Sequence, residues 1–358
     1  MIVIVGAGPV GCFLGYLLAK EGRNVAIYEE HAIIGKPIQC TGLVTKELSS
    51  VVKLKKEFIL NRLNIARVCS YNNSVEVGIN EYVLDRVKFD KHLADLAVKS
   101  GAKIIHGAKV IDIGKNEIFI KSKKGKVRVK ADIIIGADGP NSIIAKKINK
   151  IKRRNYVGLQ ARIKGNFDDN QHITYFGDVC PGFFAWVVPE SKKIARIGLA
   201  CEKDVKGCFD RLLKKLKINN NDIINKQAGL MPLYDKKLKV QERGMYLVGD
   251  AATQVKATTG GGLVFGLKAA KILADCIING KDYTKRLKKL NKELSIHLKI
   301  RSILNRFNDK DFSYLIKLVR GEKVQSVLKN SNREYPSKLM LKLLFNEPRF
   351  LFFMKKLF

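Results

Sequence analysis

The first thirty residues alternate between apolar runs and a helical stretch. Ile2–Val5 is an uninterrupted apolar run rich in β-branched side chains, which predicts a buried parallel strand. Residues 12–20 have the pattern of a helix that Gly22 ends, and residues 24–28 predict a second strand. The chain is therefore expected to begin with a strand–helix–strand unit.

Similar patterns continue along the chain. Further strands are predicted at residues 61–84, 101–106, 131–135 and 245–248, with a turn at 123–126. Helices are predicted at 87–100, from about 142, from about 262 to 279, and once or twice between 42 and 60. Residues 152–240 differ, because they contain alternating strands and one helix at about 204–216. Alternation of this kind is typical of an antiparallel sheet with one covered face.

These patterns predict an α/β protein with a discontinuous architecture. We expect a Rossmann-like domain from residues 1–60, 82–150 and 241–280. A mostly antiparallel β domain for substrate is expected at 61–81 and 151–240, with a basic helical region at 281–358.

The turn after the first strand carries the motif of a dinucleotide site. Gly6, Gly8 and Gly11 have the GxGxxG spacing. They permit a tight turn, close approach of a pyrophosphate, and close packing of helix on strand. Pro9 opens the helix, and Glu29 at the end of the second strand is positioned to accept hydrogen bonds from a ribose diol.

Two later strand ends repeat this arrangement of glycine and carboxylate. One is Gly136-Ala137-Asp138-Gly139, and the other is Gly249-Asp250, which precedes the triple glycine 260–262. Ligands of doubly wound sheets lie across the carboxyl ends of the strands. Asp250 is expected to hold the ligand, with a helix N-cap as the alternative.

Composition narrows the class of protein. The 358 residues carry 67 Lys and Arg against 33 Asp and Glu, a net charge of +34. Three interpretations of this charge compete: a charged solvated surface, docking on an anionic membrane, and nucleic-acid binding. The chain has no nucleic-acid motif, so no nucleic-acid partner is expected. The seven cysteines are scattered and the five histidines lack metal-ligand spacing, so we expect a reducing cytoplasm and no metal. No signal peptide and no membrane span are expected.

Taken together, the motifs resemble the FAD-dependent oxidoreductases of the aromatic-hydroxylase type, and within them the geranylgeranyl reductase family. The resemblance covers residues 1–280 and includes Leu84-Asp85-Arg86, Cys40-Thr41-Gly42, and the aromatic motif from Pro181 to Pro189. The chain departs from the family pattern at three positions, where Phe184, Val188 and Ala257 replace a tyrosine, a phenylalanine and a proline.

The resemblance implies a cofactor, a site and a reaction. FAD contacts are expected from Gly6, Gly8, Pro9, Gly11, Glu29, Glu30, Cys40, Arg86, Asp138, Gly139, Asp250, Gly260, Gly261 and Gly262. Phe184, Trp186 and Val188 are expected to form an apolar wall for an isoprenoid chain, or else an ordinary core face. The reaction implied is reduction of C=C bonds in geranylgeranyl chains of ether lipids, with NAD(P)H or a reduced carrier protein as electron donor. The alternative is an FAD-dependent monooxygenase.

Three expectations keep an alternative. Cys40 is either a group beside the flavin, as proton donor or as a residue that positions substrate, or an inert loop thiol. A water held near Cys40 is the alternative proton donor. Arg86 either binds the flavin edge or pyrophosphate, or forms a surface ion pair with Asp85. The basic tail at residues 350–358 either rests on anionic lipid, on the face of a cytoplasmic membrane, or packs as a capping helix on the FAD domain.

Overall fold

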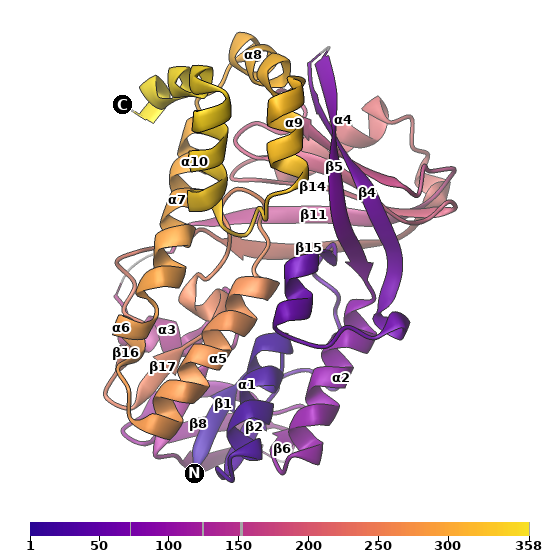
Figure 1. The fold of residues 1–358 in the computed structure, drawn as a ribbon. Helices are drawn as coiled ribbons and strands as arrows, with labels where there is room; N and C mark the ends of the chain where they lie inside the picture. Colours follow the sequence, from indigo (N-terminus) through magenta and orange to yellow (C-terminus); the bar gives the residue numbers. More distant parts are fainter. Residues whose placement is uncertain (72, 124, 151–152, 358) are drawn as a thin grey trace. The chain divides into compact units, whose positions relative to one another are not determined.

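The computed structural model describes residues 1–71, 73–123, 125–150 and 153–357 (Figure 1). The chain divides into two compact units, each assembled from three segments. The first unit comprises Met1–Ile38, Arg86–Arg154 and Met231–Ser295. The second unit comprises Gln39–Asp85, Asn155–Leu230 and Ile296–Phe358.

The first unit is built on a six-stranded sheet that is parallel except at one edge. Its order is β16 (Gln241–Glu242), β17 (Met245–Leu247), β10 (Ile133–Gly136), β1 (Ile2–Val5), β2 (Val25–Tyr28) and β6 (Lys103–Ile105). All four residues of β1 are buried, and β1 pairs with β10 on one side and β2 on the other. From β1, the sheet continues through β2 on one side and through β10 on the other, so the strand order reverses between β1 and β10. Doubly wound sheets bind their ligands at such a switch point.

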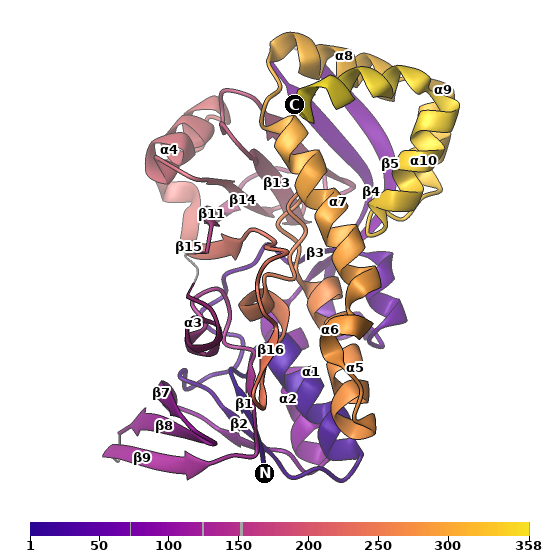
Figure 2. The same cartoon turned by 90° about the vertical axis from the view of Figure 1, so that its left-hand side faces the viewer.

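Helices and a small sheet cover the two faces of this central sheet. The helix α1 (Pro9–Lys20) packs between α2 (Arg86–Lys99) and α5 (Leu263–Asn279), as Figure 1 shows. On the other face lies a three-stranded antiparallel sheet of β7 (Lys109–Gly114), β8 (Glu117–Ser122) and β9 (Gly125–Lys130), seen in Figure 2. Ile118 and Ile120 of β8 share one buried cluster with Val3 and Ile134 of the central sheet. The short helices α3 (Ile143–Ile148) and α6 (Tyr283–Arg286) and the 3-10 turn η4 (Gly249–Ala252) complete the unit.

The second unit is built on an eight-stranded sheet. Its order is β15 (Ile223–Pro232), β11 (Asn155–Lys164), β14 (Ile194–Cys201), β13 (Phe184–Ser191), β12 (Gln171–Phe176), β4 (Ile59–Ser70), β5 (Asn73–Leu84) and β3 (Leu43–Thr45). β12 and β4 run parallel, whereas β11, β14, β13 and β12, and β4, β5 and β3, pair antiparallel. The mostly antiparallel second sheet that the sequence predicts is therefore confirmed.

Helices of the second unit pack on this sheet and on each other. The helix α4 (Val205–Lys215) packs on β14 and β11, and α8 (Asp309–Val319) and α9 (Glu322–Lys329) pack on β5. Helix α10 (Pro336–Asn346) packs on α9 and on η5 (Pro348–Leu357), a 3-10 helix. Figure 2 shows α8, α9 and α10 curving over β4 and β5. The unit boundary falls within α7 (Lys288–Leu304).

The division differs from the predicted one at several boundaries. Residues 82–85 belong to the second unit and residues 231–240 to the first. Residues 39–60 belong to the second unit rather than to the Rossmann-like unit, because β3 pairs with β5 at the edge of the second sheet. The predicted separate region at 281–358 is shared between the units. Residues 296–358, including η5, group with the second unit. A capping helix on the Rossmann-like unit stays a prediction.

One local prediction is wrong, and two fall partly outside the structure. The helices expected between residues 42 and 60 are only the 3-10 turns η1 (Lys46–Ser50) and η2 (Lys56–Phe58). The serine pair and the valine pair at residues 49–52 lower helix propensity, which accounts for the short turns. The predicted turn at 123–126 includes Lys124, and the predicted tail includes Phe358, and both residues lie outside the described part. A third short turn, η3 (Asn220–Asp222), precedes β15.

Candidate functional site

The turn after β1 has the close packing that its glycines were predicted to permit. A Cβ on Gly6 would lie 2.5 Å from the carbonyl oxygen of Ala137, and Gly6 has a φ of +99°. A Cβ on Gly11 would lie 2.1 Å from the carbonyl oxygen of Gly6. At Gly8, by contrast, nothing lies within 4 Å of where a Cβ would be. Two glycines therefore close the turn, and the third leaves open space above it.

The open space lies at the N-terminus of α1. Gly8 is the N-cap residue and offers no side chain to the first turn, and Pro9 occupies the first helical position. Pro9 has no N–H of its own. The other N–H groups of the first turn carry the positive end of the helix dipole, which is the arrangement that binds a phosphate group.

Of the two glutamates after β2, one faces the glycine turn. Glu29 Oε2 accepts a hydrogen bond from the N–H of Ala7 at 2.7 Å. Its Oε1 accepts another from the N–H of His31 at 2.9 Å, and the ring Nδ1 of His31 lies 2.7 Å away. Glu30 is exposed and pairs with Lys109 at 2.9 Å. Glu29 is thus the residue placed for a ribose at this turn, and Glu30 points to a surface lysine.

The strand end after β10 lies against the glycine turn. Asp138 Oδ2 accepts a hydrogen bond from the N–H of Ile143, which fixes the start of α3, and burial raises the pKa of Asp138. A Cβ on Gly139 would meet nothing within 4 Å. Arg153, which the sequence analysis did not single out, donates from Nη1 to the carbonyl of Ala251 and from Nη2 to that of Ser142. Arg153 thereby links the second and third strand ends.

A buried hydrogen-bond network shapes the third strand end. Asp250 is the second residue of the η4 turn after β17, and Gly249, the first, has a φ of +67°. Gln254 Oε1 accepts a hydrogen bond from the N–H of Gly249 at 2.7 Å. The Tyr283 hydroxyl lies 3.2 Å from Gln254 Nε2 and donates to the carbonyl of Leu247 at 3.2 Å. Gln254 and Tyr283, which the sequence did not identify as site residues, therefore hold the strand end that presents Asp250.

The electrostatics of Asp250 set it apart from the other carboxylates of the first unit. Burial raises the pKa of Asp250 to about 6, and the nearby Arg86 guanidinium offsets part of that rise. Arg86 itself forms a two-pronged ion pair with Asp90, at 3.0 and 2.9 Å. Arg86 opens α2 and so faces the residue four positions on. The alternative of a surface ion pair with Asp85 stays a prediction.

These three strand ends fit FAD. Uncapped N–H groups and open space at Gly8 suit a pyrophosphate, Glu29 suits the ribose, and Asp250 suits the ribityl hydroxyls. The loop of Gly260, Gly261 and Gly262 leads directly into α5. The structure thus brings together the predicted cofactor residues of the first unit, with Glu30 as the exception.

In the second unit, a buried arginine anchors the cysteine motif. Cys40 is half-buried, and its Sγ accepts a hydrogen bond from the N–H of Gly42 at 3.3 Å. Arg196 of β14 donates from Nη1 to the carbonyls of Thr41 and Leu84, at 2.5 and 3.2 Å. A Cβ on Gly42 would lie only 2.6 Å from that Nη1. The glycine thus lets the guanidinium reach the loop.

Glu190 completes this anchor. Its Oε1 accepts from Arg196 Nε at 2.6 Å, and its Oε2 accepts from Arg162 Nε at 2.7 Å. Glu190 and Arg196 are both buried. The sequence analysis missed these residues, because the contact joins Arg196 to a loop 155 positions earlier.

The predicted aromatic wall lies beside the cysteine motif. Phe184, Trp186 and Val188 alternate with Ala185 and Val187 along β13, so they share one face of the sheet. The rings of Phe184 and Trp186 meet edge to face, with centroids 5.8 Å apart. Both side chains are partly exposed, whereas Val188 is buried.

One glutamine connects the wall to the cysteine loop. Gln160 Oε1 accepts hydrogen bonds from Thr41 Oγ1 at 2.9 Å and from Trp186 Nε1 at 3.3 Å. A Cβ on Gly198 would lie 2.8 Å from the Trp186 ring and 2.4 Å from Gln160 Cβ. The indole therefore lies against a strand position that must be glycine. Cys40 and the aromatic wall are thereby neighbours within the second unit.

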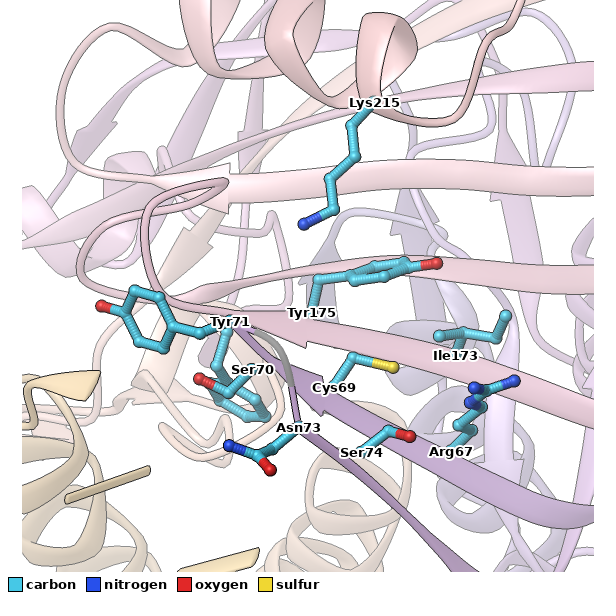
Figure 3. A pocket seen from close by; sticks show the side chains of 10 residues that line it. Arg67, Cys69, Ser70, Tyr71, Asn73, Ser74, Ile173, Tyr175 and Lys215 are labelled. Carbon is cyan, nitrogen blue, oxygen red and sulfur yellow. The ribbon is translucent and has the colours of Figure 1, made fainter. Parts of the chain in front are cut away.

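A cavity of about 300 Å³ lies on the opposite face of the same sheet (Figure 3). Arg67, Cys69, Tyr175 and Lys215 line it, and the Lys215 ammonium lies 5.5 Å above the Tyr175 ring. Tyr175 follows Thr174, the partner of Trp186 in the sheet, so its side chain points to the other face. None of the predicted site residues lines this cavity.

No helix in the described ranges combines the length and the apolar composition needed to cross a bilayer. All seven cysteines, each of which the structure describes, are free thiols.

Comparison with known proteins agrees with the fold. Residues 4–41 match the family model of the NAD(P)-binding Rossmann-like domain. An uncharacterized protein of Methanocaldococcus jannaschii is 30% identical over 374 residues, covering 96% of this chain and 94% of that protein. The digeranylgeranylglycerophospholipid reductase of the same organism is 28% identical over 370 residues, covering 91% and 92%.

Solved structures share the fold over the whole chain. A geranylgeranyl bacteriochlorophyll reductase-like protein from Thermoplasma acidophilum has a TM-score of 0.80 and 24% identity, covering 100% of this chain and 98% of its own. The flavin-dependent halogenase CmlS has a TM-score of 0.70 and 15% identity, covering 97% and 78%.

Fold and site together define an FAD-dependent oxidoreductase. Within that class, the chain belongs to the geranylgeranyl reductase family.

Proposed function

We propose that the protein reduces C=C bonds of geranylgeranyl chains on ether lipids. The observation that carries the proposal is the shared hydrogen-bond acceptor, Gln160 Oε1, which joins Thr41 of the cysteine motif to Trp186 of the apolar wall. An apolar aromatic surface beside a thiol suits a long hydrocarbon and a proton donor. The relatives named digeranylgeranylglycerophospholipid reductase support the same substrate class.

FAD, Cys40 and the aromatic wall each have a distinct task in the proposed reaction. When bound, reduced FAD supplies a hydride to one alkene carbon. Cys40 holds at Sγ the proton that the other carbon takes up, and the N–H of Gly42 stabilises the thiolate left behind. The Phe184 and Trp186 rings orient the chain and exclude water from an alkene that has no activating group. A proton from solvent then restores the thiol.

The electron donor and the location follow from the same proposal. NAD(P)H or a reduced carrier protein returns electrons to the flavin after each turnover. The lipid substrate places the enzyme on the cytoplasmic face of a membrane, and the seven free thiols fit that reducing compartment.

Mass spectrometry of unsaturated ether lipid incubated anaerobically with the dithionite-reduced enzyme tests the reaction. We expect a gain of two hydrogens for each double bond reduced. Cys40→Ala is expected to retain FAD and lose most turnover, whereas Cys69→Ala, the other half-buried cysteine, is expected to turn over normally. Hydroxylated product formed with oxygen, and no reduced lipid, would establish the monooxygenase alternative instead.

A further inference from the structure

Exposed large apolar side chains cluster at one place in the described part of the chain. Of the large hydrophobic side chains that are exposed in the described part of the chain, five lie within fourteen residues of α10 and η5. They are Leu341, Phe345, Leu351, Phe352 and Met354. The others are scattered singly between residues 33 and 224. Clustered exposed apolar residues indicate an interaction surface, whereas scattered ones are ordinary.

The outward face of α10 mixes apolar and basic residues. Lys338, Leu341, Lys342 and Phe345 are spaced at three and four positions, so they lie along one side of the helix. All four are exposed, Phe345 to 87% and Leu341 to 70%. A helix that faced the core with this side would have buried both large residues.

η5 continues the same arrangement. Its Phe353 is buried and packs on Phe307, with ring centroids 4.8 Å apart, which fixes the inward side. Leu351, Phe352 and Met354 are left exposed, and the Lys355 ammonium lies 5.7 Å from the Phe352 ring. Because α10 and η5 pack on each other, the two exposed sets belong to one part of the second unit.

The charge of this segment selects the kind of partner. Residues 336–356 contain Lys338, Lys342, Arg349, Lys355 and Lys356 against the single acid Glu347. Arg349 already pairs with that acid, at 2.6 and 2.7 Å. In a chain of net charge +34, two copies of this basic surface would repel each other. Lys356 pairs with Asp311 at 2.8 Å. An anionic lipid surface attracts Lys338, Lys342 and Lys355 and accepts the apolar side chains near them.

We propose that α10 and η5 form a docking surface for an anionic membrane, with Leu341, Phe345, Leu351, Phe352 and Met354 entering the boundary between headgroups and acyl chains. The surface brings the enzyme to substrate held in a bilayer, and to that extent the proposal rests on the proposed function. Docking itself needs only the surface and the lipid.

Co-sedimentation with sucrose-loaded vesicles tests the docking. We expect the protein to bind phosphatidylcholine vesicles that contain about 30% phosphatidylserine, to bind pure phosphatidylcholine more weakly, and to lose affinity as salt is raised. The variant L341S/F345S is expected to lower the partition coefficient by at least about tenfold, while its melting temperature and FAD content stay unchanged. The control V98S/V127S removes two side chains that are 52% and 51% exposed on α2 and β9, and it is expected to bind as wild type.

Three results would overturn docking. The first is wild-type protein that stays in the supernatant with anionic vesicles at low salt. The second is L341S/F345S binding to vesicles at the wild-type level. The third is a wild-type dimer that L341S/F345S converts into a monomer in light scattering.

Turnover separates this proposal from the reductase function. L341S/F345S should reduce detergent-dispersed lipid at the wild-type rate and vesicle-held lipid more slowly. Vesicle binding without reduction in either assay would remove the reductase function and leave the docking surface in place.

Discussion

Replacement of Arg196 by lysine provides a sharp test of how the cysteine motif is positioned. The guanidinium of Arg196 bonds three acceptors at once, from Nε to Glu190 and from Nη1 to the carbonyls of Thr41 and Leu84. A lysine keeps the charge, but its single ammonium cannot reach both the carboxylate and the loop. The Cys40 loop is then free to shift.

The structure sets the size of the expected effect. Breaking a buried ion pair costs about 3–5 kcal/mol, and the lower end applies because Glu190 keeps its bond to Arg162. Because lysine retains one of these contacts, we expect R196K to lower the free energy of unfolding by about 2 kcal/mol. A displacement of about 1 Å at a reacting group costs about a hundredfold in rate, so turnover is expected to fall by about that factor.

The matched control is R162K. Arg162 bonds the same Glu190 carboxylate, at 2.7 Å, and this bond does not involve the cysteine loop. R162K is therefore expected to keep turnover within a fewfold of wild type. Three measurements compare R196K with R162K: the rate of lipid reduction, the FAD content, and the rate at which iodoacetamide alkylates Cys40. If Cys40 is alkylated at the same rate in R196K and R162K, and the two variants reduce lipid at the same rate, Arg196 does not position the cysteine.

Two further predictions concern the cofactor site and the aromatic wall. Burial raises the pKa of Asp250 from 3.8 to about 6, so the folded apoprotein gains stability as pH falls through 6. FAD is expected to bind more weakly below pH 6, because protonation removes the charged carboxylate that accepts hydrogen bonds from the ribityl hydroxyls. Titration of apoprotein with FAD between pH 5 and 7 is expected to show this loss of affinity. Asp250→Asn should make the affinity independent of pH, and Asp250→Ala should lose FAD. A wild-type affinity that does not change with pH would contradict the role given to Asp250. For the wall, Gly198→Ala is expected to cost about 1–3 kcal/mol and to shift the emission of Trp186, because the new Cβ would lie 2.8 Å from the indole. Trp186 is the sole tryptophan, so its fluorescence reports this site directly, and an unchanged spectrum would show that the indole does not lie on Gly198.

Much of the first unit was predictable because local chemistry dictates it. The turn of Gly6 and Gly11 packs backbone against backbone, and glycine alone fits there, so sequence spacing was a sufficient signal. The pairing of Arg86 with Asp90 was also within reach, since residues four apart on a helix face each other.

The second unit held features that a sequence cannot reveal by pattern. Arg196 meets Thr41 and Leu84 only after β14 and the cysteine loop are assembled into one unit, and nothing in either segment announces the other. The outward direction of Phe345 and Leu351 is a similar case, because an apolar residue in a helical pattern predicts burial by default. Tertiary packing decides both.

The hydrogen bonds that meet at Gln160 Oε1 have a consequence for timing within a turnover. Because Thr41 and Trp186 donate to one oxygen atom, a ligand that tilts the indole also changes the hold on the loop that carries Cys40. In the proposed reaction, a hydrocarbon that contacts Trp186 would thereby also adjust the position of Cys40. Substrate and proton donor would then be aligned in the same step.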